Sequence, residues 1–165
     1  MNVERAVENA LGGVTLDPPI DVRAALQNFG ITVRLQPMES GVSGMLVVRH
    51  NKASIAVNSE HSVARQRFTL AHELGHYLLH RNEQDVFVDA PLYRDKKSSL
   101  GTDRLEIEAN AFASAFLLPE KLLEREVNAP VDPLDEAQLQ HLANRYKVSV
   151  QAVVYRLMRL NLMAE

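Results

Sequence analysis

The stretch His72-Glu73-Leu74-Gly75-His76 decides how this chain is interpreted, because it combines a helical pattern with metal-binding side chains. It lies in residues 62–80, where apolar residues recur at helical spacing. Residues four apart lie one turn apart on one helical face, so His72 and His76 can both bind one tetrahedral Zn²⁺. Glu73 lies beside them and is placed to accept a proton from a zinc-bound water. The sequence therefore predicts a metal-site helix with Glu73 as general base.

Gly75, inside this helix, carries a second prediction. Glycine in a helix interior costs about 1 kcal/mol relative to alanine. A helix that bears this cost between two metal ligands is expected to have another element packed closely against it at that point. We therefore expect a tight helix contact at Gly75.

A catalytic zinc site needs a third protein ligand. His80 lies roughly 12 Å along the helix axis from His72, so it is expected to be a surface histidine or one that supports a ligand from behind. The sequence also does not match the metzincin pattern H-E-x-x-H-x-x-G-x-x-H. Leu79 stands where that pattern has Gly, and Asn82 stands where it has the third His. The third ligand is therefore expected to be a carboxylate from another element.

Glu108 is the preferred carboxylate. It follows Ile107 in a largely apolar helix and is close in angle to the apolar positions Leu105 and Phe112, and a carboxylate on an inward face needs a partner such as a cation. Glu106 is the alternative. The more ordinary interpretation of Glu106 is a solvent-exposed carboxylate in the first turns of the helix, without a ligand role.

The composition limits the class of protein. With 165 residues, 46% hydrophobic and 24% charged, the chain is expected to form a single globular domain. It has no cysteine, so any metal must be held by His and carboxylates. A formal net charge of -3 gives no basic surface for nucleic acid, and no apolar run is long enough for a signal peptide or a membrane span. We expect a cytoplasmic protein with no direct nucleic-acid or membrane contact.

Periodicity and turn residues predict an α+β domain that is mainly helical, with a short antiparallel sheet. Residues 1–58 form N-terminal helices and a small sheet, residues 60–118 the metal-site helices, and residues 119–165 a C-terminal helical segment. The expected elements are helices at 3–11, 22–29, 62–80, 103–117, 135–146 and 149–160 and strands at 31–35, 45–48 and 53–57.

Two segments near the metal-site helix could contribute to substrate binding or to access to the site. Residues 53–57 are interpreted either as the sheet edge on which a substrate strand is added or as a plain core strand. Residues 81–103 lack periodicity and hold turn-forming residues, so we expect a mobile loop that borders the cleft. Phe87, Leu92 and Tyr93 would cover the site when that loop closes.

Two separated motifs carry a family resemblance. Residues 65–80 (RQRFTLAHELGHYLLH), followed by residues 106–113 (EIEANAFA) and by Leu117-Leu118-Pro119, resemble the ImmA/IrrE-type metallopeptidases. The resemblance implies a gluzincin-like, zincin-like peptidase domain that binds one Zn²⁺ per chain. It implies His72, His76 and Glu108 as ligands and Glu73 as general base. Members of the family typically cleave a helix-turn-helix repressor or antitoxin, and so switch on mobile-element or stress genes.

Two other functions are weighed against a zinc endopeptidase. A noncatalytic module that acts on a transcriptional repressor would keep the metal only as a structural device, but it would have no need of Glu73. A DNA-binding regulator is suggested by residues 139–160, which resemble a helix-turn-helix and carry Arg156 and Arg159. The acidic residues nearby favour packing or partner docking for this segment.

Overall fold

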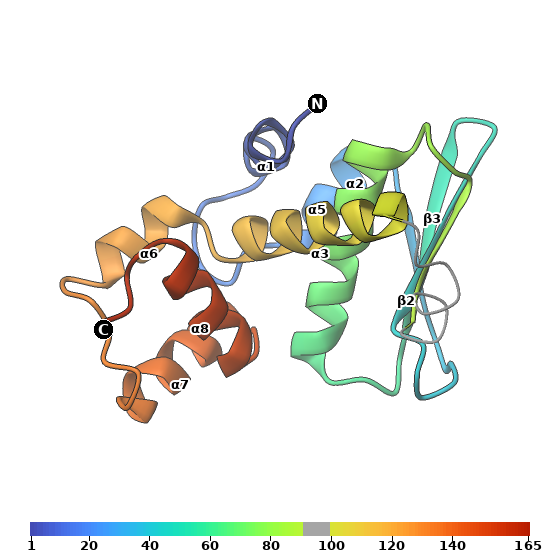
Figure 1. Cartoon of the computed structure of the whole chain (residues 1–165). Helices are drawn as coiled ribbons and strands as arrows, with labels where there is room; N and C mark the ends of the chain where they lie inside the picture. The colour runs from blue at the N-terminus through green and yellow to red at the C-terminus, as the bar shows by residue number, and fades with distance from the viewer. Residues whose placement is uncertain (91–99) are drawn as a thin grey trace.

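The computed structural model describes residues 1–90 and 100–165, and it shows an α+β fold. In Figure 1 the sheet lies at one end, the C-terminal helices lie at the other, and two long helices cross between them. The helices are α1 (Val3–Leu11), α2 (Val22–Asn28), α3 (Val63–His80), α5 (Leu100–Leu117), α6 (Glu120–Glu126), α7 (Glu136–Tyr146) and α8 (Val150–Arg159), and the strands are β1 (Thr32–Gln36), β2 (Gly44–Arg49), β3 (Lys52–Asn58) and β4 (Val86–Asp89).

Most element boundaries follow the predicted ones because polar caps mark the helix starts. The side chain of Asp21 accepts a hydrogen bond from the backbone N–H of Ala24, and Ser62 caps α3 in the same way. α5 begins at Leu100, slightly before the predicted start. The β2–β3 turn consists of His50 and Asn51, both with positive φ, which is the conformation of a type I′ hairpin.

The sheet has the strand order β1-β3-β2-β4 and is mixed, because β1 runs parallel to β3 while the other pairs are antiparallel. The expectation of a purely antiparallel sheet is therefore incomplete. β3 lies between β1 and β2 and has both edges paired. The interpretation of residues 53–57 as a substrate-binding edge is wrong, and the alternative of a core strand is confirmed.

β4 lies inside the segment for which a loop was expected. Its residues Val86-Phe87-Val88-Asp89 are short but alternate in burial, with Phe87 and Asp89 buried and Val86 exposed. A four-residue strand in a polar context gives too little periodicity for prediction from sequence. Phe87 is a core residue of the sheet, and the rest of the gating hypothesis, on Leu92 and Tyr93, lies outside the described residues.

α3 packs across the sheet on one side and against α5 on the other. The closest approach of the two helices is at Gly75, where an added Cβ would lie 3.1 Å from Cβ and Cδ1 of Phe112. Phe112 is fully buried and stacked on Phe116, so it has no room to move away. The predicted close contact at Gly75 is confirmed, and its partner is α5.

We expect Gly75→Ala to lower the free energy of unfolding by about 1–3 kcal/mol, because overpacking outweighs the gain in helix propensity. Chemical denaturation measures the change. The Phe112→Leu background provides the control, since a smaller side chain there relieves the contact. An equal loss in both backgrounds would mean that the contact with Phe112 is not the cause.

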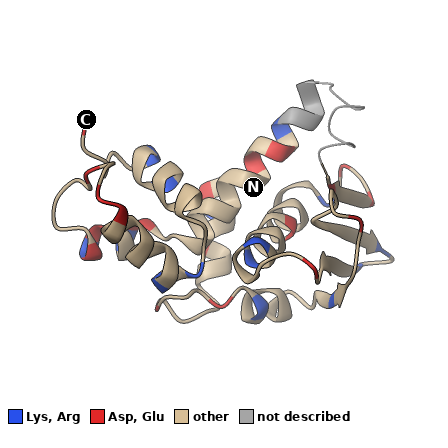
Figure 2. Cartoon of the chain, turned by 90° about the horizontal axis from the view of Figure 1, so that it is seen from below, with Lys and Arg blue, Asp and Glu red and all other residues tan. Residues whose placement is uncertain are grey.

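The C-terminal helices belong to the same hydrophobic core as the sheet and the long helices. Arg156, which was considered for phosphate contact, donates a hydrogen bond to the carbonyl of Leu118 at 2.9 Å and is partly buried, which lowers its pKa. In the view of Figure 2, basic residues lie among acidic ones instead of gathering on one element. Among the described helices, none has both the length and the apolar character that a bilayer-spanning helix requires.

Candidate metal centre

The two histidines of the motif face one another on α3. His72 and His76 are each 1% exposed, and their Nε2 atoms lie 3.0 Å apart. Two such nitrogens within this distance repel unless a proton or a cation lies between them. This pair therefore has the chemistry of a cation site.

Glu106 on α5 completes the group. Its Oε2 lies 3.3 Å from Nε2 of His72, and its Oε1 lies 3.2 Å from Nε2 of His76. Ligand atoms that each lie about 2.0–2.1 Å from a tetrahedral zinc are separated by roughly 3.3 Å. His72, His76 and Glu106 thus form a ligand set that fits one divalent metal ion.

Glu108, the carboxylate preferred from the sequence, does not reach the two imidazoles. Its Oε2 lies 2.8 Å from Nε2 of His80, and its Oε1 accepts a hydrogen bond from Arg104 at 3.0 Å. Residues two apart on a helix are separated by about 200°, so Glu106 and Glu108 flank the buried stripe of α5 on opposite sides. The structure therefore brings the alternative, Glu106, to the histidine pair in place of Glu108.

The outer nitrogens of both histidines are also engaged. Nδ1 of His72 lies 2.8 Å from Oδ1 of Asn110, an amide oxygen that only accepts, so Nδ1 carries the proton and Nε2 keeps its lone pair. Nδ1 of His76 lies 3.0 Å from Nδ1 of His80. Such partners fix the tautomer and the ring orientation of metal-binding histidines.

His80 is buried and links His76 to Glu108. Because the Glu108 carboxylate accepts, Nε2 of His80 donates to it, and Nδ1 of His80 is left to accept from His76. With its proton on Nδ1, His76 keeps a lone pair on Nε2, and this nitrogen faces His72 and Glu106. His80 is thus not a surface residue, and it lies behind His76 in the position that a supporting partner of a metal ligand would take.

Glu73 is fully buried beside the pair. One carboxylate oxygen each of Glu73 and Asp89 and one nitrogen of His72 lie within 4.8 Å of one another. Asp89 is the last residue of β4, so the edge of the sheet reaches the metal site. The same strand places Phe87 in a stack with His76, with 4.5 Å between ring centroids.

The electrostatics of the three-residue group are those of a site that holds positive charge. Burial lowers the pKa of His72, but the hydrogen bond with Glu106 and the nearby carboxylates outweigh it and raise that pKa to about 9. Burial lowers the pKa of His76 to about 4. Burial alone would raise the pKa of Glu106, yet its contacts with the two imidazoles hold it well below its usual range. The contacts with Glu106 therefore favour a positive charge between the two imidazoles, which a bound metal ion would supply.

Comparison with known proteins identifies the family of the chain. The model of a peptidase family described as the IrrE N-terminal-like domain matches residues 26–158, which include all the residues of the metal centre. The chain belongs to this family.

The chain is also similar to individual proteins that are named metallopeptidases. The chain is 34% identical over 132 residues to the radiation response metalloprotease IrrE of Deinococcus radiodurans, covering 78% of this chain and 37% of that protein. It is 33% identical over 79 residues to the metallopeptidase ImmA of Bacillus subtilis, covering 47% of this chain and 43% of that protein. The chain therefore spans about two fifths of the length of these curated relatives. A divalent metal is what this family implies.

A solved structure shares the fold. A Mycobacterium tuberculosis transcriptional regulator superimposes with a TM-score of 0.58 at 19% identity, over 94% of this chain and 46% of that one. At this identity the likeness concerns the fold alone. The α+β class predicted from the sequence is confirmed.

Proposed function

We propose that this domain is a zinc-dependent endopeptidase in which His72, His76 and Glu106 hold the metal and Glu73 acts as general base. The observation that carries the proposal is the convergence of two imidazole nitrogens and one carboxylate, with the buried Glu73 next to them in sequence. Two imidazoles and a carboxylate suit Zn²⁺. When bound, such an ion acidifies a water molecule and polarises the carbonyl of the scissile bond.

The position of β4 supports a polypeptide substrate. β4 is an edge strand of the sheet within the described residues, and its end lies at the metal centre. Asp85 and Asp89 offer their backbone carbonyls to the β2 side. Since alternate residues of a strand direct their N–H and C=O groups to opposite sides, those of Val86 and Val88 point away from β2. An extended peptide added along this edge would pass beside the histidine pair.

We further propose that the substrate is a regulatory protein, a helix-turn-helix repressor or antitoxin, as the family resemblance implies. Cleavage of such a protein would switch on mobile-element or stress genes. In this proposal the domain acts in the cytoplasm, binds one Zn²⁺ per chain and makes no direct contact with nucleic acid.

A cleavage assay tests the proposal. The metal-stripped chain is reloaded with zinc and mixed with the helix-turn-helix protein encoded beside its gene, and the products are identified by mass spectrometry. We expect cleavage at discrete sites that stops on chelation and returns with zinc. Cleavage that persists in chelator, or an intact partner with the zinc-loaded chain, would contradict it.

A further inference from the structure

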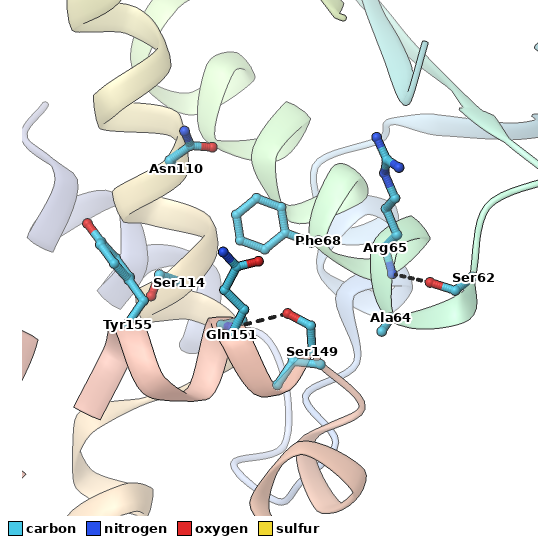
Figure 3. A pocket seen from close by; sticks show the side chains of 11 residues that line it. Ser62, Ala64, Arg65, Phe68, Asn110, Ser114, Ser149, Gln151 and Tyr155 are labelled. Atoms are coloured by element: carbon cyan, nitrogen blue, oxygen red, sulfur yellow. Dashed lines mark hydrogen bonds between the residues drawn. The ribbon is translucent and has the colours of Figure 1, made fainter. Parts of the chain in front are cut away.

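A pocket of about 850 Å³ lies where α3, α5 and the start of α8 meet, and we call it the α8 pocket. Its apolar lining consists of Ala64, Phe68, Val148, Ala152 and Tyr155. Figure 3 shows the Phe68 ring projecting from α3 into the space between α5 and α8, with Tyr155 on the α8 side. A concave site of this size with aromatic walls is typical of a place where a ligand binds.

The α8 pocket adjoins the metal centre. Phe68 lies one turn before His72 on α3, with 6.5 Å between their ring centroids. Asn110 lines the pocket and also contacts Nδ1 of His72 at 2.8 Å. One helical turn is about 5.4 Å, and consecutive Cα atoms of a peptide are about 3.8 Å apart. The pocket is therefore close enough to the metal centre to hold the side chain of a residue beside the cleaved bond.

The α8 pocket offers no charge to a ligand. Of its lining residues in the described part of the chain, Arg65 alone is ionic, and its guanidinium donates to Oγ of Ser43 at 3.1 Å. In Figure 3 the Arg65 side chain extends away from α8. The hydroxyl of Ser114 is buried in the wall. A charged side chain that entered the pocket would lose water without gaining an ionic partner, so the pocket disfavours it.

Aromatic surface at the α8 pocket is left in contact with water. Tyr155 is 51% exposed, and Phe68 is only partly buried although it packs against the hydrophobic core. Covering apolar surface is favourable in proportion to its area, and aromatic rings gain further from offset or edge-on contacts with one another. The occupant that gains most here is a large apolar side chain, and an aromatic one above all.

We propose that the α8 pocket is a specificity subsite that binds a large apolar side chain, with a preference for an aromatic ring, on a substrate residue beside the cleaved bond. This inference rests on the proposed peptidase function. Phe68 and Tyr155 contact the ring, and the small side chains of Ala64 and Ala152 leave room for it. The sheet and the C-terminal helices lie at opposite ends of the molecule (Figure 1), so β4 and the α8 pocket hold the substrate on two sides of the metal centre.

Peptide binding tests the subsite without requiring cleavage. The protein is the full chain carrying Glu73→Gln and supplied with zinc. The probes are acetyl-Ala-Ala-Phe-Ala-Ala-amide and its two analogues with a central Ala or a central Glu. NMR titration follows the backbone amides of Phe68 and Ala152. We expect the Phe peptide to shift these amides saturably and to bind about tenfold more tightly than either analogue, because it alone buries a ring.

Variants locate the preference within the pocket. Ala152→Leu fills the pocket without adding charge and is expected to weaken binding of the Phe peptide about tenfold. Tyr155→Ala removes an exposed wall and is expected to weaken it about threefold, whereas Tyr155→Phe keeps the affinity because the ring remains. Met158→Ala is the matched control, since it is an exposed apolar change on α8 outside the pocket lining, and it is expected to leave the affinity unchanged.

Equal binding of the three peptides, tighter binding of the Glu peptide, or shifts away from the pocket would each overturn the subsite. Unchanged affinity in both Ala152→Leu and Tyr155→Ala would overturn it as well, because the ring would then bind elsewhere. Cleavage by the chain with Glu73 intact is scored separately. Binding of the Phe peptide as expected, without cleavage of any peptide or protein, would refute the peptidase and leave the apolar pocket standing. Cleavage of the partner protein without a preference among the peptides would do the reverse.

Discussion

Glu106→Ala is expected to release the zinc, whereas Glu108→Ala is expected to retain about one ion per chain. The Glu106 carboxylate contacts both imidazoles, so its removal takes away one of three protein ligands. Glu108 reaches the histidine pair only through His80, and loss of such a supporting partner typically costs about 10- to 100-fold in affinity. Metal content after gel filtration, followed by competition with a chelator, measures both effects.

The two variants serve as controls for one another because they lie on the same helix and remove the same functional group. Retention of zinc in Glu106→Ala together with its loss in Glu108→Ala would restore the ligand set expected from the sequence. Circular dichroism of both proteins separates loss of a ligand from loss of fold.

Glu73→Gln is expected to keep the zinc and the fold but to lower kcat by about 10²-fold or more. Glutamine is nearly isosteric with glutamate, yet it cannot take a proton from a metal-bound water. The rate of partner cleavage by the zinc-loaded variant is the measurement. Glu124→Gln, an exposed change on α6, is the matched control, with wild-type turnover expected. Wild-type turnover by Glu73→Gln would refute the general-base role.

The sequence predicts the helices well because their starts and ends carry local signals. Asp21, Ser62, Asp135 and Ser149 each cap a helix at or next to the predicted start. The pairing of strands that no short turn connects has no such local signal. The parallel pairing of β1 with β3 and the short β4 both depend on contacts between residues far apart in sequence, so neither was predicted.

At the metal centre, His72 and His76 follow from helical spacing, but the third residue of the group does not. Glu106 and Glu108 flank the same apolar stripe, and the choice depends on how α5 crosses α3, which is a tertiary property. A local signal did exist in the four-residue spacing of Glu106 and Asn110, which matches the spacing of the two histidines they contact. Asn110 was not predicted as a member of the site.

The crossing of α3 and α5 at Gly75 and Phe112 would couple metal binding to folding, because the residues of the metal centre come from both helices. His76 and Glu106 lie thirty residues apart in sequence, so the unfolded chain has no preformed site. A ligand that binds only the folded chain stabilises it by about 2.7 kcal/mol at a hundredfold excess over its Kd. The thermal midpoint should therefore rise with free zinc, and a substitution that loosens the crossing should weaken zinc affinity without touching a ligand. By this linkage, the supply of the metal would also set the fraction of the chain that is folded.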